Sequence, residues 1–291
     1  IQTMYRDPSE PYIWLGTYRG VSRFNLDTGT FPNWAKEVGN PNSLSNDVVT
    51  AIVRDRDGTL WVGTLEGLNR LDPATGHVER TLRTRGIPGL PDETIRALHI
   101  DERGYLWIGS YGGLAVLDPQ RDRIRSVLTE EELPAAAVMS IQPDPEEERL
   151  WLGVWGTGLV RYDIPAEFRD GEEPAGGPAL ELFPLGDDRV YTVLPGPDRY
   201  VFAGSWGGGL YRVDRVTGEV DGFRHEPSQL YSLSHDTVYS LAFDDSGALW
   251  IGTNGGGVNR LSENKRNYLR FRHEYQSPAG VSQGRITAIR R

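Results

Sequence analysis

The chain has 291 residues, with 35 Gly, 19 Pro, 8 Trp and no Cys. Its 31 Lys and Arg against 41 Asp and Glu give a formal net charge of −10, which argues against a nucleic-acid-binding protein, because phosphate contacts need clustered cations. The lack of Cys excludes disulfides, thiolate nucleophiles and Cys-ligated zinc, and no apolar run approaches the ~20 residues that span a bilayer. The abundant Gly, Pro and aromatic residues favour turn-rich β structure.

One four-residue phrase recurs along the chain: an apolar residue, an aromatic residue, an apolar residue and glycine. Its six copies end at Gly16, Gly63, Gly109, Gly153, Gly204 and Gly252, and the aromatic residue is Trp in all but the fifth, which has Phe202. A period of about 46 residues is typical of the four-stranded blades of a β-propeller.

Each repeat predicts four antiparallel strands in the same order. The second strand carries the Trp phrase, a Gly-rich turn leads into the third, and a polar fourth strand closes the repeat. The expected first strands are residues 1–6, 49–54, 95–100, 138–142, 190–194 and 238–243. Residues 165–178 are rich in Pro, Gly and acidic residues and predict a loop insertion in the fourth blade.

The pattern therefore predicts an all-β fold, with residues 1–291 forming a single β-propeller domain of six complete four-stranded antiparallel blades. Residues 281–289 repeat the pattern of residues 44–52 with one residue fewer, which predicts the first strand of a seventh unit. Two closures stay open: the chain is cut within a seven-bladed ring, or this strand helps to close a six-bladed one.

Three segments carry the fullest version of the repeat, residues 43–72, 92–118 and 232–261. They combine Ser-Leu-Ser before a Val-x-x-Ile strand, Leu-Trp-Ile-Gly-Thr, and Gly-Gly-x-x-Arg-Leu-Asp-Pro, although no single segment has every element. This combination resembles the two-component regulator propeller repeat, which forms the extracytoplasmic sensor of bacterial signalling receptors.

The resemblance implies that the chain is a fragment of a larger receptor. It places the fragment on the periplasmic or extracellular side of the bacterial inner membrane, and it puts the transmembrane segment and a kinase or cyclase output domain outside this stretch. It also implies a carbohydrate fragment as a candidate ligand and allows a homodimer of the full-length receptor.

Comparison between blades separates residues that every blade needs from residues that vary. The recurring Trp is expected to pack between neighbouring blades, because large rings dominate core burial. The glycine runs at 207–209 and 255–257 predict hairpin turns, since no phosphate-loop Lys follows them. Residues 55–58 lack a full set of calcium ligands, and His77, His99 and His235 show no metal-ligand spacing. The sequence therefore predicts no metal site, no cofactor and no catalytic residue.

Two columns of positions vary between blades and are expected to face one mouth of the central channel. The residue after the second strand is Tyr18, Leu65, Tyr111, Trp155, Trp206 or Asn254. The second residue of the innermost strand is Gln2, Thr50, Arg96, Met139, Tyr191 or Tyr239, with Thr287 in the partial unit. Such a mixture suits a sugar or another flat polar ligand, because rings stack on its faces while a few polar groups orient it.

The predicted ligand-binding residues are Tyr18, Arg19, Arg96, Tyr111, Trp155, Tyr191, Trp206 and Tyr239. Arg96 would favour a carboxylate or sulfate substituent. Two alternatives stay open: these aromatic residues fill the top of the ring, or they contact a partner protein.

Three classes of function are compatible with the repeat. The first is an extracytoplasmic ligand-sensing domain without catalytic activity of its own, which binds a small molecule or an oligosaccharide. The second is a propeller enzyme of the streptogramin lyase or lactonase type, but the inward column lacks the metal ligands of such enzymes. The third is a platform for protein interactions. The resemblance favours the first.

Overall fold

The computed structural model describes residues 1–7, 10–83, 89–134, 137–165, 179–229, 231–261, 268–271, 281 and 284–289, apart from the side chains of Arg80 and Tyr268. All but the first residue of the predicted insertion at 165–178 lies outside these residues. The chain divides into two compact units, Ile1–Ile141 and Gln142–Ile289. The prediction of a single domain over residues 1–291 stays a prediction.

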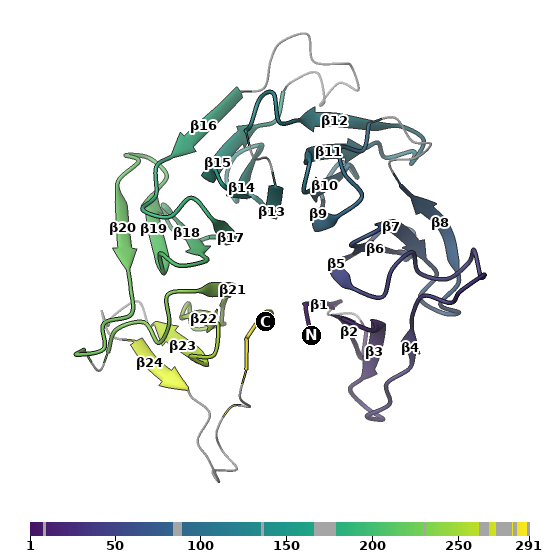
Figure 1. Cartoon of the computed structure of the whole chain (residues 1–291), viewed down its shortest axis with the longest axis horizontal. Coiled ribbons are helices and arrows are strands. Elements are labelled where there is room, and N and C mark those ends of the chain that lie inside the picture. The colour runs from purple at the N-terminus through teal and green to yellow at the C-terminus, as the bar shows by residue number, and fades with distance from the viewer. Residues whose placement is uncertain are drawn as a thin grey trace. The chain divides into compact units, whose positions relative to one another are not determined.

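The first unit contains three four-stranded antiparallel sheets, and the strands of each follow chain order (Figure 1). The first sheet is β1 (Thr3–Arg6), β2 (Tyr12–Thr17), β3 (Gly20–Asn25) and β4 (Asn33–Trp34). The second is β5 (Val49–Arg54), β6 (Leu60–Thr64), β7 (Gly67–Leu71) and β8 (Val78–Leu82). The third is β9 (Ile95–Ile100), β10 (Leu106–Ser110), β11 (Gly113–Leu117) and β12 (Ile124–Leu128).

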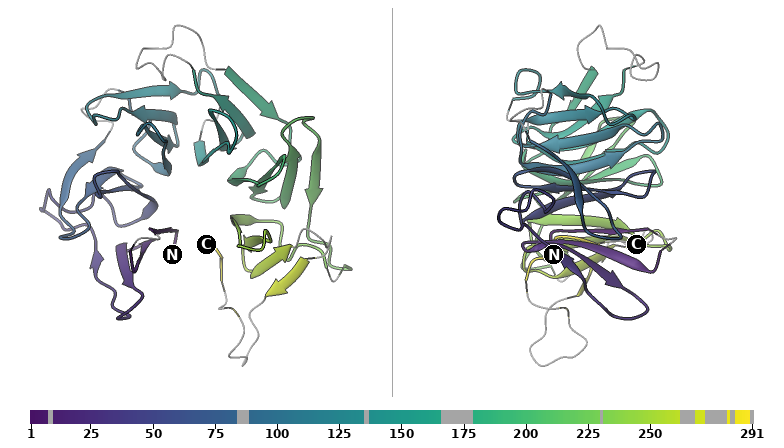
Figure 2. Two further views of the ribbon diagram at one scale, coloured as in Figure 1. Left: turned by 180° about the vertical axis from the view of Figure 1, so that it is seen from behind. Right: turned by 90° about the vertical axis from the view of Figure 1, so that its right-hand side faces the viewer.

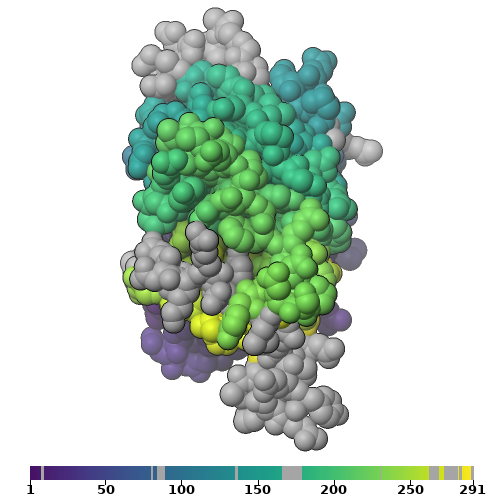
Figure 3. Space-filling view, turned by 90° about the vertical axis from the view of Figure 1, so that its left-hand side faces the viewer, coloured from purple at the N-terminus to yellow at the C-terminus, as the bar shows by residue number. Residues whose placement is uncertain are grey.

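The second unit repeats this organisation, and the boundary between the units falls within β13. The fourth sheet is β13 (Ala137–Pro143), β14 (Arg149–Trp155), β15 (Gly158–Asp163) and β16 (Ala179–Phe183). The fifth is β17 (Val190–Pro195), β18 (Tyr200–Ser205), β19 (Leu210–Asp214) and β20 (Val220–Phe223). The sixth is β21 (Val238–Phe243), β22 (Leu249–Thr253), β23 (Val258–Leu261) and β24 (Tyr268–Phe271). Figure 2 shows the blades from behind, and the outer strands β16 and β20 face the viewer in Figure 3.

Every regular element of the described residues is a β-strand. The predicted fold class, a β-propeller with six complete four-stranded antiparallel blades, is confirmed. The blades are numbered 1 to 6 in chain order below.

The glycine that ends the Trp phrase lets the next first strand approach closely. A Cβ added to Gly63 would lie 2.7 Å from Ile95 Cγ2, and one added to Gly204 would lie 2.5 Å from Val238 Cγ1. Real Cβ atoms do not pack this tightly, so a larger residue would push the blades apart. The glycine therefore recurs for packing.

The same contact recurs at the predicted start of a seventh unit. A Cβ on Gly252 would lie 2.7 Å from Ile286 Cγ2, and Ile286 N donates to Thr253 O at 3.0 Å. Residues 284–289 nevertheless form no strand, and their pairing is limited to an isolated bridge between Arg285 and Asn254. This stretch therefore packs against Gly252 as a first strand does, but it does not form the ladder of backbone hydrogen bonds that pairs a first strand with a second.

The recurring Trp is buried in blades 1 to 4, as predicted, while Trp250 of blade 6 is half-buried. Trp61 is fully buried among residues of blades 2 and 3 that include Ile95 and Leu106. Trp151 is likewise buried with Val190 of the following blade. Large apolar rings at these positions join one sheet to the next.

Four of the recurring Trp side chains also have a carboxylate acceptor for the indole N–H, a feature that the repeat pattern did not predict. The Nε1 atoms donate to a carboxylate six or seven residues earlier, in the pairs Trp61–Asp55 (2.8 Å), Trp107–Asp101 (3.1 Å), Trp151–Asp144 (2.7 Å) and Trp250–Asp244 (2.7 Å). Blade 5 has Phe202 in place of the Trp and Gly196 in place of the Asp. Donor and acceptor are absent together there, so neither is left unsatisfied.

Two of these carboxylates also accept a hydrogen bond from an arginine of the next blade. Arg121, in the turn between β11 and β12, donates through Nε and Nη2 to both oxygens of Asp55, at 2.8 and 2.7 Å. Arg215, in the corresponding turn of blade 5, donates through Nη1 to Asp144 at 3.3 Å. These ion pairs link blades 2 and 3, and blades 4 and 5.

Candidate functional site

β-bulges position the inner column of the predicted site. The ladder between first and second strands skips one residue at Thr50, Arg96, Tyr191 and Tyr239. A bulged residue is released from the regular alternation of the strand, so its side chain points in a new direction. Four residues of the variable column are therefore bulged residues.

In blades 3 and 5 the other column is tied to the same edge of the blade. Tyr111 N donates to Thr94 O at 3.2 Å, and Trp206 N donates to Arg189 O at 3.0 Å. In both blades the acceptor directly precedes the innermost strand. Within a blade, the two columns thus meet at the start of the first strand.

Four predicted residues form one contact group in the second unit, which we call the aromatic cluster: Trp155, Tyr191, Trp206 and Tyr239. The ring centroids of Trp155 and Trp206 lie 5.4 Å apart, at an interplanar angle of 67°. Tyr239 meets Tyr191 at 4.9 Å and Trp206 at 5.6 Å, edge to face in both cases. Tyr191 and Trp206 lie 6.3 Å apart. The cluster therefore joins blades 4, 5 and 6.

Exposure is graded across the cluster. Tyr239 is only 3% exposed, while Trp206 is 36% exposed and Trp155 and Tyr191 are half-buried. Tyr239 therefore forms the base of the cluster, and Trp206 offers the largest accessible ring. The cluster thus has a packed ring at its base and an accessible aromatic surface at Trp206.

Two arginines beside the cluster were not among the predicted residues. The Arg285 guanidinium carbon lies 5.1 Å from the centroid of the Tyr239 ring. Arg189 pairs with Trp155 in a β-bridge, and its Nε and Nη2 donate to Asp187 at 2.8 and 3.0 Å. Arg189 directly precedes the first strand of blade 5, and Arg285 has the matching position before Ile286. The residue at this position also varies between blades, so the repeats contain a third variable column.

Asp187 holds Arg189 in place. The carboxylate also accepts a hydrogen bond from Gly207 N at 2.9 Å. Burial by itself would raise the pKa of Asp187, but its hydrogen bonds from Arg189 and the backbone outweigh this and lower it. In turn, Asp187 raises the pKa of Arg189, so the pair stays ionised at neutral pH.

The remaining predicted residues lie in the first unit. The Arg96 guanidinium carbon lies 5.8 Å from the Tyr111 ring centroid, and 48% of Tyr111 is exposed. Tyr18 is 57% exposed and Arg19 is exposed as well. Among the described residues, neither Tyr18 nor Arg19 makes a ring or cation–π contact with the other predicted residues. The eight residues are thus a cluster of four, a pair, and two exposed neighbours.

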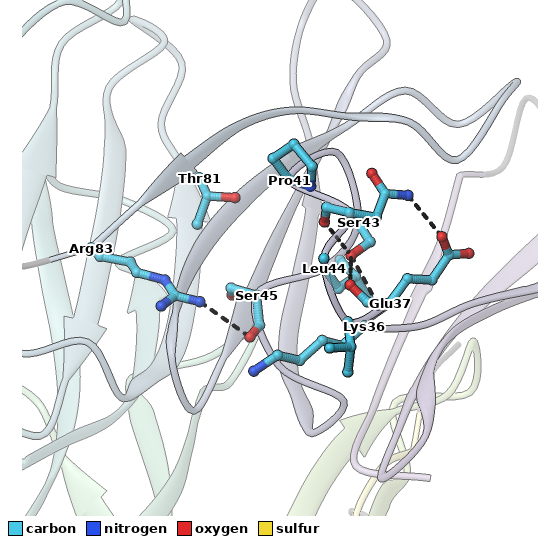
Figure 4. A pocket seen from close by; sticks show the side chains of 11 residues that line it. Lys36, Glu37, Pro41, Ser43, Leu44, Ser45, Thr81 and Arg83 are labelled. Atoms are coloured by element: carbon cyan, nitrogen blue, oxygen red, sulfur yellow. Dashed lines mark hydrogen bonds between the residues drawn. The ribbon is translucent and has the colours of Figure 1, made fainter.

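Two clefts of the first unit are lined by none of these residues. They have volumes of about 620 and 520 Å³ and flank the connection between β4 and β5. Figure 4 shows the side chains that line the first of them. Glu37, Asn40, Ser43 and Leu44 line both. The repeat pattern predicts no site in this region.

Within the described residues, no group of three or more His, Asp or Glu is placed to hold a metal ion. His225 has a structural role, since its Nδ1 lies 2.7 Å from Leu233 O. No helix among the described residues is long and apolar enough to cross a membrane.

The structure separates the base of the aromatic cluster from its surface in a testable way. Tyr239→Ala is expected to lower the free energy of unfolding by about 3 kcal/mol, because a buried aromatic side chain is lost. Trp206→Ala is expected to cost about 1–2 kcal/mol, mainly through its contacts with the neighbouring rings. Urea unfolding monitored by circular dichroism measures both. Equal losses would show that Trp206 is part of the core rather than an accessible surface.

Comparison with known proteins supports the interpretation of the repeats. A family described as two component regulator propeller matches residues 43–66, 89–112 and 232–255. These matches coincide with three copies of the Trp phrase, in blades 2, 3 and 6. No curated protein matches the chain.

Several solved structures resemble the chain. The extracellular domain of BT3049 from B. thetaiotaomicron, described as a hybrid two component system, is 26% identical, with a TM-score of 0.71 over 89% of this chain and 33% of that one. The extracellular domain of BT4673, from the same organism, is 18% identical with a TM-score of 0.61, over 93% of this chain and 43% of that one.

PorZ of Porphyromonas gingivalis, a surface component of the type-IX secretion system, is 17% identical with a TM-score of 0.67, over 89% of this chain and 38% of its own. The last two likenesses concern the fold alone. The chain spans about a third to two fifths of the length of these proteins. Three segments of the chain thus match the two component regulator propeller family, and the resemblance predicted from the sequence is confirmed.

Proposed function

We propose that the chain is the ligand-sensing propeller of a bacterial signal-transduction receptor and acts on the extracytoplasmic side of the inner membrane. The observation that carries this proposal is the family match in three blades, together with the likeness to the extracellular domain of a two component system. In this proposal the chain has no catalytic activity, and the membrane-spanning and output segments belong to the rest of a receptor that works as a dimer.

The aromatic cluster is the proposed ligand site. Trp206 offers an accessible ring, on which the apolar face of a sugar can stack. Arg285 lies at the edge of the cluster and is exposed, so it can pair with a carboxylate or sulfate of an acidic sugar. These features favour a carbohydrate fragment, and an acidic one in particular.

The test starts with a screen of neutral, uronic and sulfated oligosaccharides on a glycan array, followed by calorimetry with the best binder. Trp206→Ala is expected to weaken its binding by about 2 kcal/mol, roughly 30-fold, because a central stacking ring is lost. Trp155→Ala should act in the same direction. Arg285→Gln should weaken acidic ligands more than neutral ones.

Tyr231→Ala is the matched control, since Tyr231 is 53% exposed and lies outside the cluster. This variant should bind as tightly as the parent. The proposed site is wrong if Trp206→Ala folds and binds the sugar with unchanged affinity. The proposal of a sensor is wrong if the full-length receptor gives the same output with and without every ligand that the propeller binds.

A further inference from the structure

Two loops of the chain are built in the same way, one before blade 2 and one before blade 6. In the first, Ser43 Oγ accepts from Glu37 N at 2.9 Å. In the second, Ser232 Oγ accepts from Glu226 N at 2.9 Å. The serine two residues further on is then held by an asparagine of the third strand, since Ser45 N and Ser234 N each donate to an Asn Oδ1 at 3.0 Å. The acceptors of the two loops therefore have matching positions.

An arginine fills the blade 6 loop. Arg270 of β24 lies opposite Asn259 of β23. Its Nε donates to Ser232 O at 2.9 Å, and its Nη2 lies 2.7 Å from Ser232 Oγ, 3.1 Å from Gln229 O and 3.3 Å from Leu233 O. One guanidinium group thus meets four oxygen atoms of a single loop.

Blade 2 has no such side chain at the matching position. Thr81 of β8 lies opposite Asn69 of β7, in the register that Arg270 has with Asn259. The shorter side chain leaves the cleft of about 620 Å³, lined by Thr81 and by the loop residues Asn40, Ser43 and Leu44. Figure 4 shows Thr81 on one side and the loop residues Pro41, Ser43 and Leu44 on the other.

The charged residues around this cleft already have partners. Glu37 accepts from Asn40 Nδ2 at 2.7 Å and adds a carboxylate to the loop side of the cleft. Lys36 Nζ donates to Glu66 at 3.0 Å, and Arg83 Nη2 donates to Ser45 O at 3.3 Å. The charged groups of Lys36 and Arg83 are therefore already paired with Glu66 and Ser45 O.

We propose that the cleft between Thr81 and the 37–44 loop binds a guanidinium group of a ligand, in the place that Arg270 fills in blade 6. A planar guanidinium has five N–H donors in a fixed fork, which suits several oxygen atoms on one side. The equivalents of the four blade 6 acceptors are Ser43 O, Ser43 Oγ, Asn40 O and Leu44 O. This site is independent of the aromatic cluster, so either proposal can fail without the other.

N-methylguanidinium is the probe, because it reproduces the end of an arginine side chain. In a titration followed by NMR of the amide groups, it should cause saturable shifts at Asn40, Ser43 and Leu44 of the parent protein. Tetramethylammonium, which has the same charge and no N–H donor, should cause none. The proposal is overturned if the shifts are absent, or if both cations cause them equally.

Reciprocal variants test the internal comparison. Thr81→Arg should abolish the shifts, because its own guanidinium fills the cleft. Arg270→Thr should add a second set of saturable shifts at Gln229, Ser232 and Leu233. The double variant Thr81→Arg/Arg270→Thr should show the shifts at Gln229, Ser232 and Leu233 and none at Asn40, Ser43 and Leu44. Gly222→Arg is the matched control, since Gly222 has the same position in β20 of blade 5, where no Ser-Leu-Ser loop precedes the blade.

Thermal melts establish which variants fold, and the titration of the parent protein decides the question even if a variant does not. Thr81→Arg binding the probe as well as the parent does would overturn the proposal. Agmatine and an acetylated, amidated Gly-Arg-Gly peptide then distinguish the source of the group. Tighter binding of agmatine assigns a free guanidino compound, and tighter binding of the peptide assigns an arginine side chain of a protein. If neither agmatine nor the peptide binds, the proposal is wrong.

Discussion

Replacing Trp61 by alanine is expected to lower the free energy of unfolding by about 3–5 kcal/mol. Trp61 is fully buried and packs against Ile95 and Leu106 of the next blade, so the substitution leaves a cavity where two sheets meet. The variant also removes the indole N–H that donates to Asp55 at 2.8 Å. Urea unfolding followed by circular dichroism measures the loss as a lower midpoint.

Two companion variants separate packing from hydrogen bonding. Trp61→Phe keeps an aromatic ring and loses the N–H, and is expected to cost about 1–2 kcal/mol. Tyr18→Ala is the control for loss of an exposed ring, because 57% of Tyr18 is accessible, and it should cost less than 1 kcal/mol, roughly. A loss for Trp61→Ala no greater than that for Tyr18→Ala would rule out the inter-blade packing role.

Replacing Arg121 by methionine is expected to cost about 3 kcal/mol at pH 7, because it leaves the Asp55 carboxylate buried without its cation. The two side chains are only 11% and 6% exposed, and both oxygens of Asp55 accept from the guanidinium. Trp61 still donates to Asp55 in the variant, which places the cost at the lower end of the usual range.

The loss should depend on pH with a defined sign. Burial by itself would raise the pKa of Asp55, but hydrogen bonds from Arg121, Trp61 and the Arg56 backbone more than reverse this and lower it to about 2. A carboxyl with a lowered pKa stabilises the fold fully above its unfolded value of 3.8, and this contribution is lost as the pH falls towards 2. The difference between parent and Arg121→Met should therefore shrink below about pH 4.

Asp55→Asn and the double variant Asp55→Asn/Arg121→Met complete a double-mutant cycle. The free energy of unfolding of all four proteins is measured at about pH 7 and at about pH 3. The coupling between Asp55 and Arg121 should be large at neutral pH and smaller at acid pH. A coupling that stays constant across this range would contradict an ionic origin. A coupling near zero at pH 7 would show that the pair contributes nothing to the link between blades 2 and 3.

Local patterns of the sequence were sufficient for the blades. Strands, turns and the buried Trp follow from alternation and repetition, because the backbone bonds of a four-stranded blade join neighbouring segments of the chain. The Asp–Trp pairs were equally local, six or seven residues apart, and the joint change to Gly196 and Phe202 in blade 5 was visible without a structure. Asp at these positions already predicts a turn, so the turn itself gives no separate signal of the hydrogen bond between the carboxylate and the indole.

The candidate site was predictable in part. The variable columns identified Trp155, Tyr191, Trp206 and Tyr239, and the structure brings these four together. Their unequal burial was not predictable, because the exposure of a ring depends on which neighbouring rings cover it. The bulges that aim Tyr191 and Tyr239 were not predictable either, since a bulge is defined by the register of two paired strands.

The sequence by itself determined the repeat, the strand order within each blade and the positions that vary between blades, because these depend on neighbours along the chain. Only the tertiary structure decided which distant side chains meet. Arg121 reaches Asp55 across 66 positions, and Arg270 reaches Ser232 across 38, whereas Thr81 leaves the equivalent place in blade 2 open. Such contacts depend on how sheets and loops pack against one another, and a one-dimensional period carries no information about that packing.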